Sequence, residues 1–203
     1  MKNRPARVLL VGVVSLVALT LAGCGMFGDK FSQAFNGYSA TMNTYTQQGA
    51  QVDNIHGTSF HVDRDTDFDS SGSDGSNADS EVLLISLGDS HIHHVGSSMI
   101  LAQDGLVDIT AQLPPSFQFS NSKPGTPWLN DLRYNFNRYW VGTSKTIMIR
   151  SQDGTPIKIY GGNDVQVLAT RVPKSTWFRI DGKTLFVYRC DYTVVDNNLL
   201  ASK

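Results

Sequence analysis

Apolar and polar side chains alternate over short stretches through most of this chain, and turn residues separate those stretches. The alternation is clear in Ile157–Tyr160 and Val165–Val167, and it predicts strands with one buried face and one solvated face. Val82–Ile85 and Leu185–Tyr188 are apolar at every position, which is typical of strands that are buried on both faces. The pattern therefore predicts a protein built mainly from short strands.

The stretches fall into two groups of six. Asp-Gly dipeptides at 153–154 and 181–182 are typical of tight hairpin turns, because both residue types tolerate positive φ. The strands predicted for the first group are Tyr38–Gln47, Gln51–His56, Ser59–Asp63, Glu81–Leu87, Ser90–Val95 and Ser98–Gln103. Those predicted for the second group are Lys145–Ser151, Pro156–Tyr160, Asp164–Thr170, Thr176–Asp181, Thr184–Cys190 and Tyr192–Asp196.

The two groups resemble each other in sequence. Thr46–Gly49 parallels Ser151–Gly154, and Ile85 matches Ile180 at an offset that is shorter by about ten residues. We interpret this as two copies of a six-strand meander, and chance similarity between strand-turn sequences is the alternative. The predicted parts are repeat 1 over about 38–106, a linker and helix over 107–143, and repeat 2 over about 144–200.

One segment has the period of a helix. Thr126-Pro127 is a favourable start, since a capping hydroxyl precedes a proline at the first helical position, and Gly142 is placed to end the helix. The apolar stripe between them is Leu129, Leu132, Phe136, Tyr139 and Trp140. The sequence therefore predicts a mainly β fold. In it, two similar meanders form a barrel-like or two-sheet structure, and one amphipathic helix (about 127–141) packs on it.

The first 24 residues follow a different pattern. A basic start, Met1–Arg7, precedes the apolar run Val8–Thr20, which is shorter than a membrane span and is typical of a secretory signal. Leu21-Ala22-Gly23-Cys24 then has the pattern of a bacterial lipoprotein signal, in which the cysteine receives a diacylglyceryl group and becomes the new N-terminus. The alternatives are an ordinary signal peptide with a chance cysteine, or an uncleaved anchor.

This pattern predicts three parts: a signal peptide (1–23), a lipidated Cys24 with a tether (24–37), and a β-rich domain (38–203). Two acyl chains hold a protein stably on a membrane, at roughly 0.8 kcal/mol per buried CH₂ group. We therefore expect a protein that is lipid-anchored at the extracellular face of the cell membrane. Cys190 would then be the only thiol left, and its apolar surroundings in sequence predict a buried structural role.

The charge of the chain bears on its partners. The formal net charge is −1, and Lys2, Arg4 and Arg7 of the leader contribute +3 to it, which leaves −4 for the rest. Since the remaining chain is mildly acidic and has no basic cluster, we expect no nucleic-acid partner.

Candidate chemistry is concentrated in an acidic loop, Asp63–Glu81. Alternating carboxylates among glycines and serines suit Ca²⁺, which takes about six to eight oxygen ligands. The segment 67–72 matches the opening of a helix-loop-helix calcium loop, but the twelfth position is Ala78 and the flanks are predicted strands. A solvated loop without metal is the alternative. The candidate ligands are Asp65, Asp67, Asp69, Ser71, Asp74, Asp79 and Glu81.

Histidines offer a second candidate metal site. His91 and His93 lie on one face of a predicted strand and can share a zinc ion, with His56 or His61 as a third ligand. Solvent-facing histidines are the alternative. The sequence contains no Gly-x-Ser-x-Gly, no phosphate-binding glycine loop and no His-Glu-x-x-His, so we predict no catalytic residue.

Several segments also resemble a known family. Val95-Gly96-Ser97-Ser98-Met99-Ile100 and Ile180-Asp181-Gly182-Lys183 are the most specific, and Tyr38–Tyr45 and Pro173–Tyr192 add to them. They resemble small surface lipoproteins of Gram-positive bacteria that are classed as a domain of unknown function. The resemblance implies a surface lipoprotein with no known enzymatic activity or site residues. We therefore expect a non-enzymatic binding or structural module with a cell-envelope or protein partner. The alternative is a calcium- or zinc-binding surface protein, including a metal-dependent hydrolase.

Overall fold

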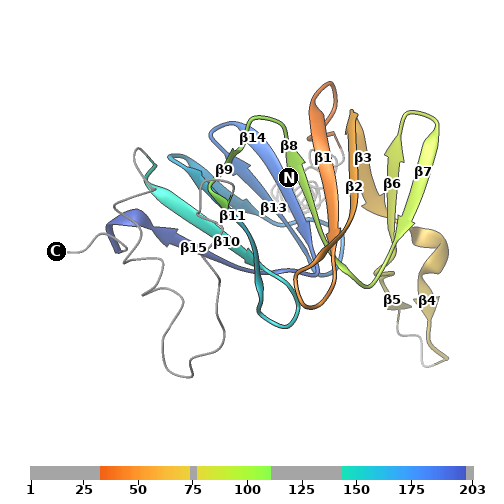
Figure 1. Cartoon of the computed structure of the whole chain (residues 1–203). Helices are drawn as coiled ribbons and strands as arrows, with labels where there is room; N and C mark the ends of the chain where they lie inside the picture. The colour runs from red at the N-terminus through yellow and green to blue at the C-terminus, as the bar shows by residue number, and fades with distance from the viewer. Residues whose placement is uncertain (1–32, 74–76, 111–142, 200–203) are drawn as a thin grey trace, which may run out of the picture.

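A computed structural model describes residues 33–73, 77–110 and 143–199 (Figure 1). The predicted signal peptide (1–23), Cys24 with most of the tether (24–37), and the predicted helix (about 127–141) lie outside these residues. The described part is mainly β, as the sequence predicts, and each of the predicted strands overlaps a strand of the structure. No helix among the described residues is long and apolar enough to cross a membrane.

The strands run in antiparallel pairs. Those of the first half are β1 (Ser39–Tyr45), β2 (Gln51–Thr58), β3 (Phe60–Arg64), β4 (Ser70–Ser71), β5 (Asn77–Ala78), β6 (Leu83–Leu87), β7 (Ser90–His94), β8 (Ser98–Gln103) and β9 (Val107–Asp108). Those of the second half are β10 (Lys145–Arg150), β11 (Pro156–Gly162), β12 (Val165–Leu168), β13 (Ser175–Ile180), β14 (Lys183–Tyr188) and β15 (Asp191–Asp196). Two 3₁₀ turns, η1 (Thr66–Phe68) and η3 (Asn197–Leu199), complete the described elements.

A six-stranded sheet with the order β12-β13-β14-β8-β1-β2 forms the middle of the molecule. Figure 1 shows the four-stranded sheet β15-β10-β11-β9 on one side of it and the three-stranded sheet β3-β6-β7 on the other. A short ribbon, β4-β5, lies below the three-stranded sheet in that view. The described chain thus forms three layers of sheet.

Two separate hydrophobic cores hold the layers together. Met99, Leu101 and Phe186 of the middle sheet belong to the core that contains Phe60 and Leu83 of the three-stranded sheet. Their neighbours in sequence point the opposite way, into a second core with the four-stranded sheet. This second core includes Ile100, Leu185, Val187, Ile147, Ile149 and Ile157. The continuous apolar runs of β8 and β14 are therefore satisfied by burial on both faces.

None of the sheets formed by the described residues closes on itself, so the barrel-like prediction is wrong. A two-sheet structure is also not what forms. The physical reason is the same for both: a middle sheet that is apolar on both faces needs a cover on each side, and two layers supply only one.

The two halves pair their strands in the same way. Met42 of β1 pairs with Ile55 of β2, and the residues 105 positions later, Ile147 and Tyr160, pair in β10 and β11. Both pairs of strands have a register irregularity near the hairpin end. In the first half β1 lies between β2 and β8, and in the second half β10 lies in the same way between β11 and β15. The strands between these form a meander in each half, β3-β6-β7 in the first and β12-β13-β14 in the second.

In the last three long strands of each half, the number of residues between equivalent positions of the two halves is smaller than 105. Val62 pairs with Ile85 and Val167 pairs with Phe178, so β6 corresponds to β13 at an offset of 93, because 178 − 85 = 93. The sequence match of Ile85 with Ile180 implies an offset of 95, which is therefore two residues too long. A two-residue error keeps the same face of a strand, which explains why the apolar pattern did not reveal it.

The layered packing leads to a stability prediction. Leu185 and Phe186 are adjacent in β14, and both are fully buried because they enter different cores. We expect Leu185→Ala to lower the free energy of unfolding by about 2–5 kcal/mol and Phe186→Ala by about 3–5 kcal/mol in denaturant titrations. Val167→Ala, at a position that is 48% exposed, is the control and should change it by less than about 0.5 kcal/mol. A near-neutral effect at either buried position would contradict the middle-layer placement of β14.

Candidate functional site

The first carboxylate of the acidic loop binds a histidine. Asp65 Oδ2 lies 2.8 Å from Nδ1 of His93, and Asp65 Oδ1 accepts a hydrogen bond of 3.1 Å from the backbone N–H of Asp67. This second bond caps η1. Only 7% of the Asp65 side chain is exposed. Asp65 therefore holds the start of the loop against β7.

The middle of the loop is held by an arginine of β3. Asp69 Oδ1 accepts hydrogen bonds from Arg64 Nη1 at 3.0 Å and from the backbone N–H of Ser80 at 2.8 Å. Asp79 forms an ion pair with the same Arg64 nitrogen. One guanidinium thus joins the two ends of the β4-β5 ribbon.

The last carboxylate of the loop joins the two halves of the chain. Glu81 Oε1 lies 2.7 Å from Nζ of Lys174, and Glu81 Oε2 lies 2.7 Å from Nη1 of Arg189. The backbone carbonyl of Glu81 also accepts a hydrogen bond of 2.7 Å from the hydroxyl of Tyr188. Hydrogen bonding to Lys174, and then the two positive charges, hold the pKa of Glu81 below its usual value.

The candidate calcium ligands are therefore divided among four partners, which are His93, Arg64, Lys174 and Arg189. Asp67 and Ser71 are exposed, and Asp74 lies outside the described residues. In the part of the chain that the structure describes, no three His, Cys, Asp or Glu side chains are grouped so that they could hold a metal ion.

The histidines have separate partners too. His91 Nδ1 lies 3.0 Å from the hydroxyl of Ser86, while His56 lies 2.9 Å from Asp104. His61 is placed opposite Ser86 in the β3–β6 ladder, on the other side of Ser86 from His91. His93, the other candidate ligand, is engaged by Asp65 as described above.

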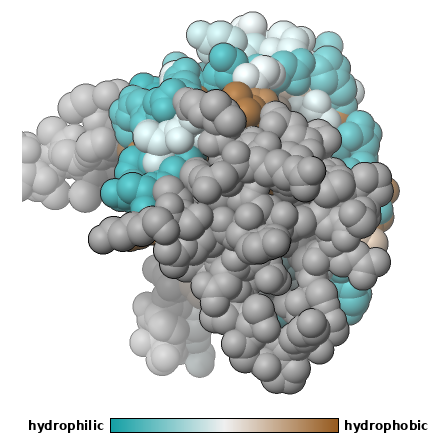
Figure 2. Space-filling view, turned by 60° about the vertical axis from the view of Figure 1, so that its left-hand side comes forward, coloured by the Kyte–Doolittle hydropathy of each residue, from teal (hydrophilic) through white to brown (hydrophobic). Residues whose placement is uncertain are grey.

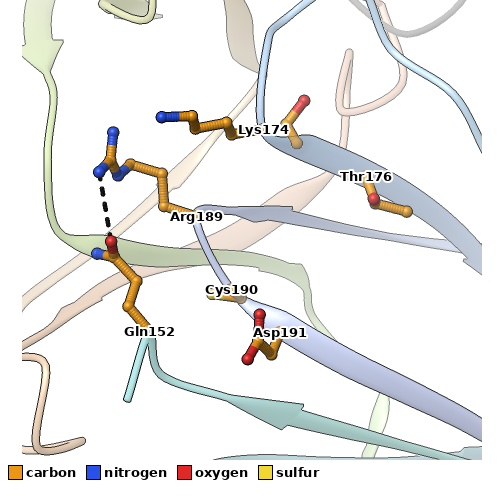
Figure 3. A pocket seen from close by; sticks show the side chains of 7 residues that line it. Gln152, Lys174, Thr176, Arg189, Cys190 and Asp191 are labelled. Carbon is orange, nitrogen blue, oxygen red and sulfur yellow. Dashed lines mark hydrogen bonds between the residues drawn. The ribbon is translucent and has the colours of Figure 1, made fainter. Parts of the chain in front are cut away.

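A cavity of about 490 Å³ lies where Glu81 meets the second half, and we call it the junction cavity. Figure 3 shows its polar side chains converging from the ends of several strands. Arg189 Nη2 donates a hydrogen bond of 3.3 Å to Gln152, whose own amide donates to the carbonyl of Gly96 at 2.8 Å. The lining residues are Gln152, Lys174, Ser175, Thr176, Arg189, Cys190 and Asp191.

The backbone around this cavity is strained. Lys174 has a φ of 58° and Arg189 a φ of 50°, a left-handed conformation that costs a residue with a side chain about 1–3 kcal/mol. A hydrogen bond of 2.8 Å from the Arg189 N–H to the Lys174 carbonyl joins the two residues. The left-handed conformation of Lys174 and Arg189 brings both side chains to Glu81. The ion pairs with Glu81 stabilise this conformation.

The junction cavity offers hydrogen-bond donors but no activated nucleophile among its lining residues. Burial raises the pKa of the Cys190 thiol to about 12, so the thiol is protonated at neutral pH and is a poor nucleophile. Cys190 packs against the second core, which fits the structural role that the sequence predicts. The geometry suits binding of a polar group better than covalent chemistry.

A second hollow, of about 300 Å³, is lined by polar residues of β1, β2, β8, β9 and β11. Lys158 Nζ lies 2.6 Å from Asp108 there, and the Asn54 amide donates a hydrogen bond of 2.7 Å to Asn43. Burial raises the pKa of Tyr160, so its phenol stays neutral. This hollow also lacks an activated group among the residues that line it.

Comparison with known families shows to which family the chain belongs. Residues 6–200 match the model of a family described as a domain of unknown function (DUF5052). The chain belongs to the DUF5052 family. The match includes both halves of the fold, and no curated protein and no solved structure matches this DUF5052 chain. The resemblance to a family of unknown function is thereby confirmed, and the family description states no activity.

The residues of the junction cavity were not predicted from the sequence. Gln152, Lys174 and Arg189 lie far apart along the chain and belong to no recognised motif. The only local signal is the position of Lys174 and Arg189 at strand ends, and strand ends are rich in charged residues in any β protein. Pairing of the strands is what brings them together.

The Glu81 cluster predicts a pH-dependent contribution to stability. Since the folded pKa of Glu81 is lowered, the contribution is present above the ordinary glutamate value and is lost as the pH falls through the folded pKa. Urea titrations should find Glu81→Gln less stable than the parent DUF5052 protein near neutral pH, with the difference shrinking in acid. Asp67→Asn, in the same loop, is the control and should match the parent. A constant difference at all pH values would contradict this role of Glu81.

The ion pairs of the loop also predict its response to calcium. Because Asp69, Asp79 and Glu81 already have cationic partners and Asp65 is bonded to His93, thermal melts with Ca²⁺ or with EDTA should give the same midpoint. A site that binds only the folded protein would add about 2.7 kcal/mol at 100 times its dissociation constant. Such a rise with Ca²⁺, lost in Asp69→Asn, would support the calcium site that the sequence suggests.

Proposed function

We propose that this DUF5052 protein is a lipid-anchored, non-enzymatic binding or structural module at the extracellular face of the cell membrane. The observation that carries the proposal is the order of the first 24 residues: a basic start, a short apolar run, and Leu21-Ala22-Gly23-Cys24. A diacylglyceryl group on Cys24 would hold the β-rich domain at the membrane surface.

The surface of the domain fits a water-exposed position. On the face shown in Figure 2, most of the described residues are hydrophilic, and apolar surface is limited to small patches. The chain without its leader is mildly acidic, so nucleic acid is not the partner that we propose. The partner that we propose is a cell-envelope component or another protein.

The chemistry of the described residues supports a non-enzymatic role. The Cys190 thiol is protonated at neutral pH, and the exposed Ser86–His91 pair has no carboxylate bonded to the histidine within the described ranges. The junction cavity instead presents Gln152, Lys174 and Arg189, and the last two also pair with Glu81. We propose this cavity as the place where a polar group of the partner binds.

Replacement of Cys24 tests the anchor. Cys24→Ala should remove the lipid, so the protein should leave the membrane fraction or accumulate as the uncleaved precursor. Cell fractionation and the intact mass of the purified protein measure this. Cys190→Ala is the matched control and should stay in the membrane fraction with a lipidated N-terminus. A Cys24→Ala protein with the parent's distribution and processing would overturn the proposal.

A further inference from the structure

Among the strands that are paired on one side only in the described residues, β7 and β15 have a particular relation to each other. β7 ends the three-stranded sheet, where its one neighbour is β6, and β15 ends the four-stranded sheet, where its one neighbour is β10. Figure 1 shows β7 and β15 at opposite ends of the molecule. They are therefore too far apart to pair with each other within one copy.

The chain already contains the pairing that these two edges would make. By the offset of 93, β7 corresponds to β14 in the second half, and β15 corresponds to β8 in the first half. β14 and β8 pair with each other in the middle sheet, from Leu185–Ala102 to Tyr188–Met99. In the middle sheet, β14 of the second half thus pairs with β8 of the first half. Their counterparts, β7 of the first half and β15 of the second half, are both edge strands.

This internal ladder fixes the register of an external one. In the β14–β8 pairs the residue numbers add to 287, as in 185 + 102. Subtracting 93 from the β14 number and adding 93 to the β8 number leaves that sum unchanged. The four equivalent pairs are Ile92–Val195, His93–Val194, His94–Thr193 and, directly after β7, Val95–Tyr192. One residue before Ile92 in β7, the same register places His91 opposite Asp196.

The side chains suit this register. It places Val95, which is 57% exposed, opposite Tyr192, which is 37% exposed, so that two exposed apolar side chains would cover each other. It also places His91 opposite the carboxylate of Asp196 and brings no like charges together. Between its terminal aspartates β15 carries no charged residue that would block an added strand.

We propose that a second copy of this chain binds here, with β7 of one copy added to β15 of the next. Main-chain hydrogen bonds would supply the pairing, as in other complexes that extend a sheet by one strand. The contact is head-to-tail, so the assembly keeps a free β7 at one end and a free β15 at the other, and chains of copies can grow. The proposal rests on strand pairing alone and is independent of the lipid anchor.

The external ladder is expected to be weaker than the internal one. β14 offers Leu185, Phe186 and Val187 to its neighbour, whereas the equivalent residues of β7 are Ile92, His93 and His94. Less apolar surface is buried at the external joint, so association should be reversible and concentration-dependent.

Disulfide trapping between two differently tagged full-length copies tests the register. One copy carries Val95→Cys and the other Tyr192→Cys, and both are expressed in the same cells and oxidised. The expected result is a disulfide-linked pair that contains both tags. The control replaces Tyr192→Cys by Val167→Cys, on the edge strand β12, which is 48% exposed against 37% for Tyr192. The parent pair reports any contribution of Cys24 or Cys190.

Three outcomes would overturn the proposal. They are no mixed-tag product above the parent pair, the same yield with Val167→Cys, or a product made only from two Val95→Cys copies, which would mean symmetric pairing of β7. A different occupant of the edges, such as another envelope protein, would give the first of these outcomes together with a larger mixed complex.

A second variant separates association from folding. Val95→Lys places a charge on the edge without touching a core, so its thermal midpoint should equal that of the parent. Sedimentation of the detergent-solubilised full chain should then show the oligomers of the parent shifted to monomer in Val95→Lys and unchanged in Val167→Lys. A parent that is monomeric at all concentrations, or a Val95→Lys protein that sediments like the parent, would contradict the proposal.

Discussion

The pairing of β14 with β8 is the interaction on which the rest of the structure depends. Both strands carry apolar side chains on both faces, so a sheet that contains them is unstable until each face is covered. The three-stranded sheet covers one face and the four-stranded sheet covers the other. Apart from the two-residue strands β4, β5 and β9, each half of the chain supplies three strands to the middle sheet and three to one outer layer. Neither half can therefore bury its apolar strands alone.

The ion pairs of Glu81 strengthen the same joint from the side. Glu81 ends the loop that leads into β6, while Lys174 precedes β13 and Arg189 follows β14. The carboxylate therefore ties an outer layer to the end of the middle sheet. Two residues in left-handed conformation, which would be costly elsewhere, are stabilised here because their side chains share one anion.

Much of the secondary structure could be predicted from the sequence, and the reasons are local. Alternation and Asp-Gly turns identify the strands, and each predicted strand overlaps an observed one. Short pairs such as β4 with β5 and the addition of β9 to β11 were missed, because two residues carry no periodicity. The number of layers was also missed. Runs such as Leu185–Tyr188 show that both faces are buried, but they do not show what covers each face.

The candidate site was harder to predict, since its residues meet only through long-range pairing. The acidic loop was correctly singled out as rich in potential ligands, yet a carboxylate binds whichever cation the fold brings near it. Here Arg64, Lys174 and Arg189 are those cations, and the Asp65 carboxylate binds the imidazole of His93. Of these, only Arg64 and His93 lie near the loop in sequence, and the partners of Glu81 come from the other half of the chain.

The difference between the two halves follows from their places in the stack. Phe186 in β14 and His93 in β7 are equivalent by the offset of 93, but Phe186 faces a core and His93 faces outward toward Asp65. In the same way the buried Tyr188 corresponds to the exposed Val95. The central strands of the middle layer, β8 and β14, are apolar on both faces, whereas an outer strand such as β7 needs only one apolar face. The polarity of the equivalent positions in β7 and β14 thus follows the layer in which each strand lies.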